Sequence, residues 1–415
     1  MKNKKYVILI LIVSFLITSC KREIVNPGNG HNSDSNTEAH VIEEPIEEIK
    51  VDIINEKLLK MSLEEKIGQL LIVGLEDKVV NETTKNMIEE YKVGGFIYFA
   101  RNIENNIQLL NLSKELKILN KDNPSPLFIS IDEEGGRVSR LPKEYERLPE
   151  SKTLCDLNDL KLSYEYGKLL GLRLNTVGIN LNFAPVLDIN SNPKNPVIGN
   201  RSFGNRADVV ISNGIEVLKG IESTGVIPSV KHFPGHGDTS VDSHVNLPKV
   251  NKTLEELEGL ELLPFKKAIE EDVGMIMIDH ILFPELDPIY PSTMSKKILT
   301  ELLRKDLGFN GVVISDDMTM GAIVENYTLE FAVLEFLKAG GDIALICHGE
   351  NNPRMVINYI KESINKGEIT IKDIDEKVYR ILTLKDKYNL KDNVNHNLSL
   401  EELSKITDEL LQKLK

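Results

Sequence analysis

The stretch from Lys231 to His244 holds the densest set of reactive side chains in the sequence. It contains three histidines and two aspartates, together with two glycines and a proline. It follows the apolar run from Val226 to Val230, which predicts a buried strand. Glycine and proline at this density continue neither a helix nor a strand, so we expect a loop at the carboxyl end of that strand. Loops in this position carry the binding and catalytic residues of many α/β enzymes.

Three kinds of chemistry are open to this loop from its residue types. A metal site is one, with candidate ligands His232, His236, Asp238, Asp242 and His244. A hydrolytic triad around Ser243 is another, although sequence neighbours rarely face one another and the chain has no Gly-x-Ser-x-Gly motif. In the third, Asp242 orients His244 as a general acid/base, because residues two apart in an extended stretch share a side. A carboxylate there favours the protonated imidazole. A solvated polar loop without a chemical role also remains open.

A second candidate is Asp316, which directly follows the apolar run from Val312 to Ser315. A carboxylate held at the end of a buried strand suits nucleophilic attack or stabilisation of a cationic transition state. Ser315, Asp316 and Asp317 are equally good helix N-caps, so residue type alone leaves a structural role open.

Short apolar runs alternate with amphipathic, helix-like segments along most of the chain. The runs that predict strands are Gln69–Val73, Gly95–Phe99, Leu127–Ile131, Ile179–Phe183, Val226–Val230, Met275–Ile278, Val312–Ser315 and Ile343–Ile346. About eight strands separated by helices fit a (β/α)₈ barrel. A doubly wound sheet produces the same rhythm, so periodicity does not decide between the two.

Polar residues follow most of these runs within a few positions. They are Asp132, Glu133, Asp188, Lys231, His232, Asp279, His280, Asp316, Asp317 and His348. Side chains at the carboxyl ends of so many strands converge on one mouth only if the sheet closes. We therefore predict an α/β fold, a (β/α)₈ TIM barrel, as a single catalytic domain with a short helical C-terminal tail. Asp188, Asp279, His280 and His348 are equally good structural hydrogen-bonding residues, and we do not assign them to the site.

Composition limits the class of protein. The 415 residues carry a net charge of −14, which argues against a nucleic-acid partner. The length allows one large domain or two ordinary ones. The three cysteines, Cys20, Cys155 and Cys347, form no Cys-x-x-Cys pair and support neither a zinc ribbon nor a disulfide framework.

The N-terminus predicts export. Three lysines precede the apolar run from Tyr6 to Ile17, which is short for a membrane span and typical of a signal peptide. Ile17-Thr18-Ser19-Cys20 resembles a bacterial lipobox, in which the cysteine is lipidated and becomes the mature N-terminus. An ordinary signal peptide or a plain anchor is the alternative. We expect lipidation of Cys20 and a protein anchored to the outer face of the cell membrane.

These observations predict four segments. Residues 1–20 are the lipoprotein signal peptide, and residues 21–50 are a flexible tether rich in Asn, Ser, Gly, Pro and Glu. Residues 51–390 are the catalytic barrel. Residues 391–415 are a helical tail with one apolar face, formed by Leu400, Leu403, Ile406, Leu410 and Leu414.

Longer motifs resemble glycoside hydrolase family 3. Residues 302–316, Leu-Leu-Arg-Lys-Asp-Leu-Gly-Phe-Asn-Gly-Val-Val-Ile-Ser-Asp, are similar to the family signature. Residues 131–140 and 199–204, and the whole 231–244 loop, are similar to its bacterial β-N-acetylglucosaminidase branch. The resemblance runs from about Met61 to about Tyr388. It implies a (β/α)₈ barrel that removes terminal β-linked N-acetylglucosamine with retention, without a metal or other cofactor.

The resemblance also implies roles for individual residues. The nucleophile corresponds to Asp316, and the acid/base to His244 supported by Asp242. The sugar-binding positions correspond to Asp132, Arg140, Arg201, Lys231 and His232. A carboxylate can accept hydrogen bonds from sugar hydroxyls, and Arg and Lys can donate to them. Most retaining glycosidases use two carboxylates, so a histidine would here replace one of them.

We therefore expect a lipid-anchored exo-β-N-acetylglucosaminidase that acts as a monomer on peptidoglycan glycans or muropeptides through a covalent intermediate. A phosphorylase that resolves the same intermediate with phosphate is the nearest alternative, followed by another family 3 β-glycosidase. A lipoprotein that binds wall sugars without turnover is a further alternative. The presence of Asp316, Asp242 and His244 argues against it, because a binding protein needs neither a nucleophile nor a paired acid/base.

Overall fold

The computed structural model describes residues 52–157, 159–240, 242–243, 246–393 and 398–414. Cys20, the predicted tether and His244 lie outside the described residues, so what we predict of them stays a prediction. Within the described ranges, no helix has the length and apolarity that a membrane span requires.

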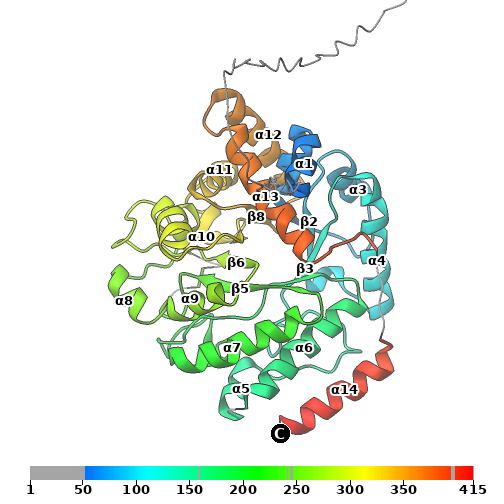
Figure 1. Cartoon of the computed structure of the whole chain (residues 1–415), viewed down its shortest axis with the longest axis vertical. Coiled ribbons are helices and arrows are strands. Elements are labelled where there is room, and N and C mark those ends of the chain that lie inside the picture. The colour runs from blue at the N-terminus through cyan, green and yellow to red at the C-terminus, as the bar shows by residue number, and fades with distance from the viewer. Residues whose placement is uncertain (1–51, 158, 241, 244–245, 394–397, 415) are drawn as a thin grey trace, which may run out of the picture. The chain divides into compact units, whose positions relative to one another are not determined.

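Eight parallel strands close into a barrel in chain order, with β8 paired to β1 (Figure 1). The strands are β1 (Leu71–Gly74), β2 (Gly95–Tyr98), β3 (Phe128–Ile131), β4 (Leu181–Asn182), β5 (Ile227–Phe233), β6 (Met275–Ile278), β7 (Val312–Asp317) and β8 (Ile343–Ile346). Their residues are almost all buried, as expected for parallel strands covered by helices on the outside and by side chains within. The predicted (β/α)₈ barrel is confirmed.

Helices surround the strands. The α-helices are α1 (Ile53–Lys60), α2 (Leu63–Gln69), α3 (Glu82–Glu89), α4 (Asn106–Leu119), α5 (Ser151–Leu157), α6 (Leu160–Thr176), α7 (Ala207–Glu222), α8 (Leu254–Gly259), α9 (Leu263–Glu270), α10 (Gly321–Val324), α11 (Leu329–Ala339), α12 (Asn352–Lys366), α13 (Ile371–Lys387) and α14 (Leu400–Lys413). Short helices η1 (Ala100–Asn102), η2 (Asn120–Asp122), η3 (Gly199–Arg201) and η4 (Ser292–Met294) lie in loops, and η5 (Lys297–Asp306) is a π-helix before β7.

Two strands run further than their apolar sequences predict. β5 continues through Lys231 and His232 to Phe233, so these two residues lie in the strand and not in the predicted loop. β7 likewise continues through Asp316 to Asp317. Polar residues end an apolar run in the sequence, but at the mouth of a barrel they point into the pocket while the backbone keeps its strand pairing.

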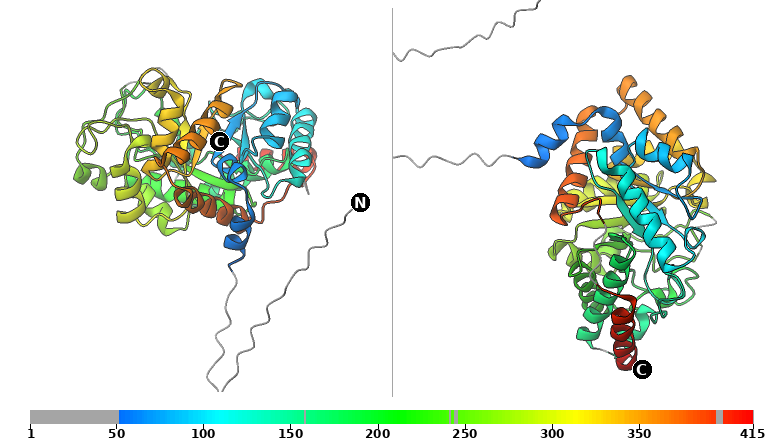
Figure 2. Two further views of the ribbon diagram at one scale, coloured as in Figure 1. Left: turned by 90° about the horizontal axis from the view of Figure 1, so that it is seen from above. Right: turned by 90° about the vertical axis from the view of Figure 1, so that its right-hand side faces the viewer.

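The predicted C-terminal helix is α14, and it packs along α6 (Figures 1 and 2). Leu403, Leu410 and Leu414 are buried, whereas Leu400 is exposed. The Arg173 guanidinium on α6 donates to Thr407 Oγ1 over 3.0 Å. The tail therefore covers a buried, charged side chain of the barrel as well as apolar surface.

Candidate active site

The carboxyl ends of the strands open onto a pocket with about 820 Å³ of open space, the part continuous with solvent included. All five predicted sugar-binding residues line it, as does the predicted nucleophile; they are Asp132, Arg140, Arg201, Lys231, His232 and Asp316. Asp242 is half-buried and does not line this pocket, although its neighbour Ser243 does. The structure thus brings together residues that are far apart in the sequence.

A buried ion network forms one side of the pocket. Lys231 Nζ lies 2.6 Å from Asp132 Oδ1 and 2.7 Å from Glu134 Oε1. Glu134 also accepts two hydrogen bonds from Arg201, each of 2.8 Å, in a bidentate pair. Two carboxylates and two cations balance their charges, which allows a charged cluster to stay inside the barrel. The network links the ends of β3 and β5 and the loop after β4.

Burial and the partner charges set the ionisation of this network. Burial alone would raise the pKa of Glu134, but Arg201 and Lys231 hold that pKa well below its usual range. Burial would lower the pKa of Lys231, but Asp132 and Glu134 raise it above its ordinary value. Glu134 and Lys231 are therefore both charged at neutral pH, and the network presents fixed donors and an acceptor to a hydroxyl-rich ligand.

Our sequence analysis did not assign Glu134 to the site. It lies two residues after Asp132, and residues two apart on an extended chain point to the same side. That spacing could have placed Glu134 beside Asp132 in the site. The neighbouring Glu133 has the same residue type, so the sequence did not show which glutamate faces the pocket. Glu133 instead accepts from Ser139 Oγ and from the backbone amides of Arg140 and Leu141. It shapes the loop that brings Arg140 to the pocket.

Asp188, in the loop that follows β4, orients His232. Its Oδ2 lies 2.5 Å from His232 Nδ1, and its Oδ1 accepts from the backbone amides of His232 and His236 over 3.2 and 2.7 Å. Burial would raise the pKa of Asp188, but His232 and His236 lower it. The carboxylate keeps a proton on His232 Nδ1 and directs Nε2 toward the pocket, 3.4 Å from Arg201 Nη2.

We expect Asp188→Asn to raise KM about tenfold while changing kcat less, in line with the roughly 1.5–3 kcal/mol of a hydrogen bond to a charged group. The amide can still accept from the backbone through its carbonyl, but its N–H₂ forces His232 into the other tautomer. Steady-state kinetics and inhibition by free N-acetylglucosamine measure this effect. A lower Tm with unchanged KM would show that Asp188 only stabilises the fold.

His236 holds the loop after β5. Its Nδ1 lies 3.0 Å from Thr239 Oγ1, and its Nε2 lies 3.1 Å from Ser243 Oγ. Burial and the neighbouring His232 lower the pKa of His236 to about 4, so the ring is neutral at physiological pH. Among the residues that the structure describes, no group of three or more His, Cys, Asp or Glu is arranged to hold a metal ion. The metal alternative gains no support here, and independence from metal stays a prediction.

The same loop is fastened to the start of the short helix α10, which follows β7 and Asp316 in the chain. The backbone carbonyl of Ser243 accepts from Ala322 N over 3.2 Å, at the start of α10. The segment that leads to His244 therefore reaches the β7 side of the pocket. The structure does not describe His244 itself, so its position and its pairing with Asp242 remain predictions.

Asp316 faces the pocket at the end of β7, and it is half-buried. Burial would raise the pKa of Asp316, but the His232 and His280 rings and Lys231 hold it below the ordinary value. In the described ranges, no residue forms an ion pair with this carboxylate. Its Oδ1 accepts only the neighbouring amide of Asp317, over 2.8 Å. Asp316 is thus ionised and free to approach a ligand.

Asp317 has a different environment, although it also lines the pocket. Its Oδ1 accepts from Thr319 N, Thr319 Oγ1 and Cys347 N over 2.9, 2.6 and 3.1 Å. The N-cap of α10 is Met320, so none of the candidate caps of the sequence analysis, Ser315, Asp316 and Asp317, caps this helix. Asp317 therefore shapes the loop between β7 and α10. The alternative that Asp316 serves as a helix N-cap is excluded for this helix.

Asp279 and His280 lie at the end of β6, and both are fully buried. His280 Nδ1 lies 2.6 Å from Thr293 Oγ1, and its Nε2 lies 3.0 Å from the carbonyl oxygen of Asp317. Ser292 Oγ donates to Asp279, whose pKa is raised by burial and by the nearby Asp188 and Asp316. These residues support the loops behind the pocket.

Fold and site together define the class of protein. A (β/α)₈ barrel whose mouth holds a balanced ion network on one side and, on the other, an ionised carboxylate with no ion-pair partner among the described residues is an enzyme scaffold for a polar, hydroxyl-rich ligand.

The chain belongs to glycosyl hydrolase family 3, because residues 62–384 match the model of the glycosyl hydrolase family 3 N-terminal domain. The resemblance noted in its sequence is confirmed. A β-hexosaminidase A of Pseudoalteromonas piscicida is 36% identical over 326 residues, which are 72% of this chain and 54% of that protein. The chain thus spans about half the length of that relative.

Solved structures of family 3 enzymes are also similar to this chain. A family 3 β-N-acetylglucosaminidase of Paenibacillus sp. FPU-7 superposes with a TM-score of 0.80 at 37% identity, over 85% of this chain and 69% of that one. NagZ of Neisseria gonorrhoeae, solved in complex with N-trifluoroacetyl-D-glucosamine, superposes with a TM-score of 0.68 at 30% identity, over 83% of this chain and 96% of that one.

Proposed function

We propose that this protein is a retaining exo-β-N-acetylglucosaminidase with Asp316 as its nucleophile. The observation that carries the proposal is the division of the pocket. The ion network of Asp132, Glu134, Arg201 and Lys231 lies at β3–β5. The carboxylate of Asp316, which has no ion-pair partner in the described part of the chain, lies across the pocket at β7. A terminal sugar held by its hydroxyls at β3–β5 places its anomeric carbon toward Asp316.

Two further observations support the choice of substrate and mechanism. The family match is to glycosyl hydrolases, and the similar proteins carry the name β-hexosaminidase or β-N-acetylglucosaminidase. A rigid carboxylate at the anomeric carbon suits a covalent glycosyl-enzyme intermediate, which water then hydrolyses with retention. Asp242 and His244 supply the acid/base in this proposal. Peptidoglycan fragments are the proposed natural substrates.

The test compares 4-nitrophenyl N-acetyl-β-glucosaminide with the matching β-glucoside. We expect kcat/KM for the N-acetyl sugar to be at least a hundredfold higher. Proton NMR should detect the β-anomer of N-acetylglucosamine first, before mutarotation. A first-formed α-anomer would exclude the retaining mechanism. If N-acetylglucosamine 1-phosphate dominates in millimolar phosphate, the protein is a phosphorylase.

The proposal includes a lipid anchor at Cys20, on the basis of the N-terminal sequence. Cys20→Ala should block lipidation and move the protein from the membrane fraction to the soluble fraction. Cell fractionation with an antibody, together with mass spectrometry of the N-terminal peptide, measures both effects. A variant that stays in the membrane with its first 20 residues intact would identify a plain helical anchor.

A further inference from the structure

Helix α6 fastens the loop that follows β3, residues 132–150, to the outside of the barrel. The Tyr166 hydroxyl on α6 donates to the carbonyl oxygen of Glu134 over 3.0 Å. The Tyr145 hydroxyl, in the loop, lies 2.6 Å from Thr176 Oγ1 at the end of α6. Both tyrosines are buried. The side chains of α6 therefore help to set the path of the loop that brings three polar residues to the pocket.

Arg173 lies on the same face of α6 as Tyr166, seven residues further along the helix, and it is fully buried. Its Nη2 donates to Thr407 Oγ1 of α14, which covers it from outside. In the described part of the chain, its Nε has no hydrogen-bond partner and no carboxylate lies within ion-pair distance of its guanidinium. A buried cation is costly unless another charge compensates for it, so this arrangement calls for an explanation.

The compensating charge is Glu133, which is also fully buried. Burial lowers the pKa of Arg173, and Glu133 is the largest of the charges that raise it. Burial raises the pKa of Glu133, which is opposed by the Ser139 hydroxyl, by two backbone amides of the loop and by the Arg173 charge. Each of the two groups therefore helps to keep the other in its ionised form.

Few other titratable groups face this pair. Burial raises the pKa of Tyr145 to about 12 and also raises that of Tyr166, so both hydroxyls are neutral at physiological pH. Glu146 faces Arg173 but is exposed, and solvent screens its charge. Glu134 is held ionised by the ion network of the pocket. Of these buried groups, Glu133 is therefore the one whose ionisation responds to mild acid.

We propose that Arg173, kept from water by α14, is a positioning residue that holds Glu133 as a carboxylate and thereby fixes the loop that brings Arg140 to the sugar. The Glu133 carboxylate accepts from the Arg140 and Leu141 amides, and a charged acceptor makes these bonds about twice as strong as a neutral one. The inference rests on the proposed function, because it concerns binding of the terminal sugar.

Arg173→Met removes the charge and keeps the length of the side chain. Loss of the cation raises the pKa of Glu133, so the carboxylate form that supports sugar binding is lost at a higher pH than in the wild type. For a change of about one pKa unit, the KM ratio of variant to wild type should be close to one near pH 8 and approach tenfold toward pH 5. Taking the ratio cancels the titration of groups common to both proteins. Arg173→Lys keeps the charge and should keep the ratio close to one.

Two measurements separate positioning from a merely structural role. Titration calorimetry with N-acetylglucosamine should give the same ratio in Kd, without turnover. In a Glu133→Gln background the amide does not titrate, so adding Arg173→Met should leave the ratio independent of pH. Thr407→Val removes the hydroxyl that holds the guanidinium and should shift the ratio in the same direction as Arg173→Met, by a smaller amount.

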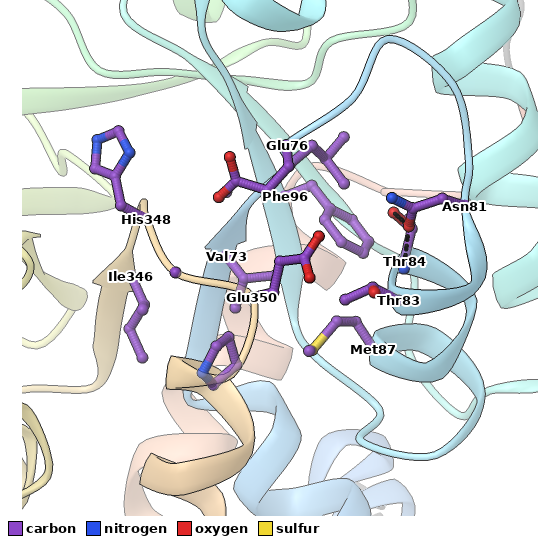
Figure 3. Close-up of a pocket in the computed structure, with 14 residues that line it drawn as sticks. Val73, Glu76, Asn81, Thr83, Thr84, Met87, Phe96, Ile346, His348 and Glu350 are labelled. Atoms are coloured by element: carbon purple, nitrogen blue, oxygen red, sulfur yellow. Dashed lines mark hydrogen bonds between the residues drawn. The ribbon is translucent and has the colours of Figure 1, made fainter.

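Two matched controls lie away from the site. Lys117→Met removes another buried cation, which donates to the carbonyl oxygen of Gly178 over 2.8 Å. Thr84→Val removes another buried threonine hydroxyl, which donates to Asn81 over 2.9 Å beside a small cavity between α3 and the strands (Figure 3). Neither Lys117 nor Thr84 lines the active-site pocket, and neither variant should change the pH dependence of KM, whatever its Tm.

The outcomes decide between the two proposals. A KM ratio of one at every pH for Arg173→Met, or the same pH-independent loss with Glu133 and with Glu133→Gln, would overturn the positioning role while hydrolysis by the wild type still supports the proposed function. If Arg173→Met does not fold, a Thr407→Val ratio of one at every pH has the same meaning. A wild type that binds N-acetylglucosamine but hydrolyses no β-glycoside of it would contradict the proposed function alone, because calorimetry still measures the ratio. A wild type that does neither would overturn both.

Discussion

Asp316→Asn should lower kcat by at least three orders of magnitude while N-acetylglucosamine still binds. The amide is nearly the same size as the carboxylate but is a poor nucleophile, so the variant loses the bond to the anomeric carbon and keeps the shape of the pocket. The residual activity of the variant on aryl substrates should remain below one thousandth of the wild-type rate. Isothermal titration calorimetry should give a Kd for N-acetylglucosamine similar to that of the wild type.

Trapping provides the direct measurement. A 5-fluoro derivative of the N-acetylglucosaminyl donor should accumulate as an adduct, and peptide mass spectrometry should locate it on Asp316. Asp317→Asn is the matched control, because Asp317 is occupied by Thr319 and Cys347 and serves the loop. The Asp317→Asn control should lower Tm clearly, whereas its kcat should stay close to that of the wild type. An adduct on Asp317 would reverse the two assignments.

His244→Ala should abolish nearly all activity on disaccharides, whose leaving groups need a proton. A protonated imidazole can give that proton, and the neutral ring can then activate water, with an unperturbed pKa near 6.5 that suits both steps. An activated aryl leaving group needs no proton. Its release should therefore survive in the variant, and hydrolysis of the intermediate should become the slow step.

Stopped-flow measurement with an aryl substrate tests this assignment. A burst of product equal to the enzyme concentration, followed by slow turnover, is the expected result. His236→Ala offers a contrast, because that ring is held between two hydroxyls and has a pKa of about 4. It should lower Tm without producing a burst. Full activity of His244→Ala on disaccharides would exclude His244 as the acid/base.

The strands were predictable because each is a short apolar run followed by a polar residue. Their ends were not, since Lys231 and His232 end the apolar pattern of β5 but not its pairing. Strand pairing is a long-range property, and a local pattern of hydrophobicity does not contain it. Closure of the barrel was inferred correctly from the polar residues after the runs, because only closure brings them to one mouth.

The sequence predicted which residues lie together in the site, but it did not predict which of them form hydrogen bonds and ion pairs with one another. Glu133 and Glu134 are neighbours of one type, yet one shapes a loop and the other binds Arg201 and Lys231. Asp188 was equally ambiguous, because its role depends on the ring of His232, 44 residues away in the chain. Such pairings follow from the fold, and residue type gives no sign of them.

The ion network around Glu134 also bears on which sugars the enzyme rejects. Its charges are paired inside the folded chain, so the donors and acceptors at β3–β5 stand in place before any ligand arrives. A deoxy sugar that lacks a hydroxyl at these contacts displaces water without replacing its hydrogen bonds. A buried charged group then loses a hydrogen-bond partner, which costs about 1–3 kcal/mol of binding free energy. Discrimination here works by penalising a missing hydroxyl group, so it should be strict toward deoxygenated sugars.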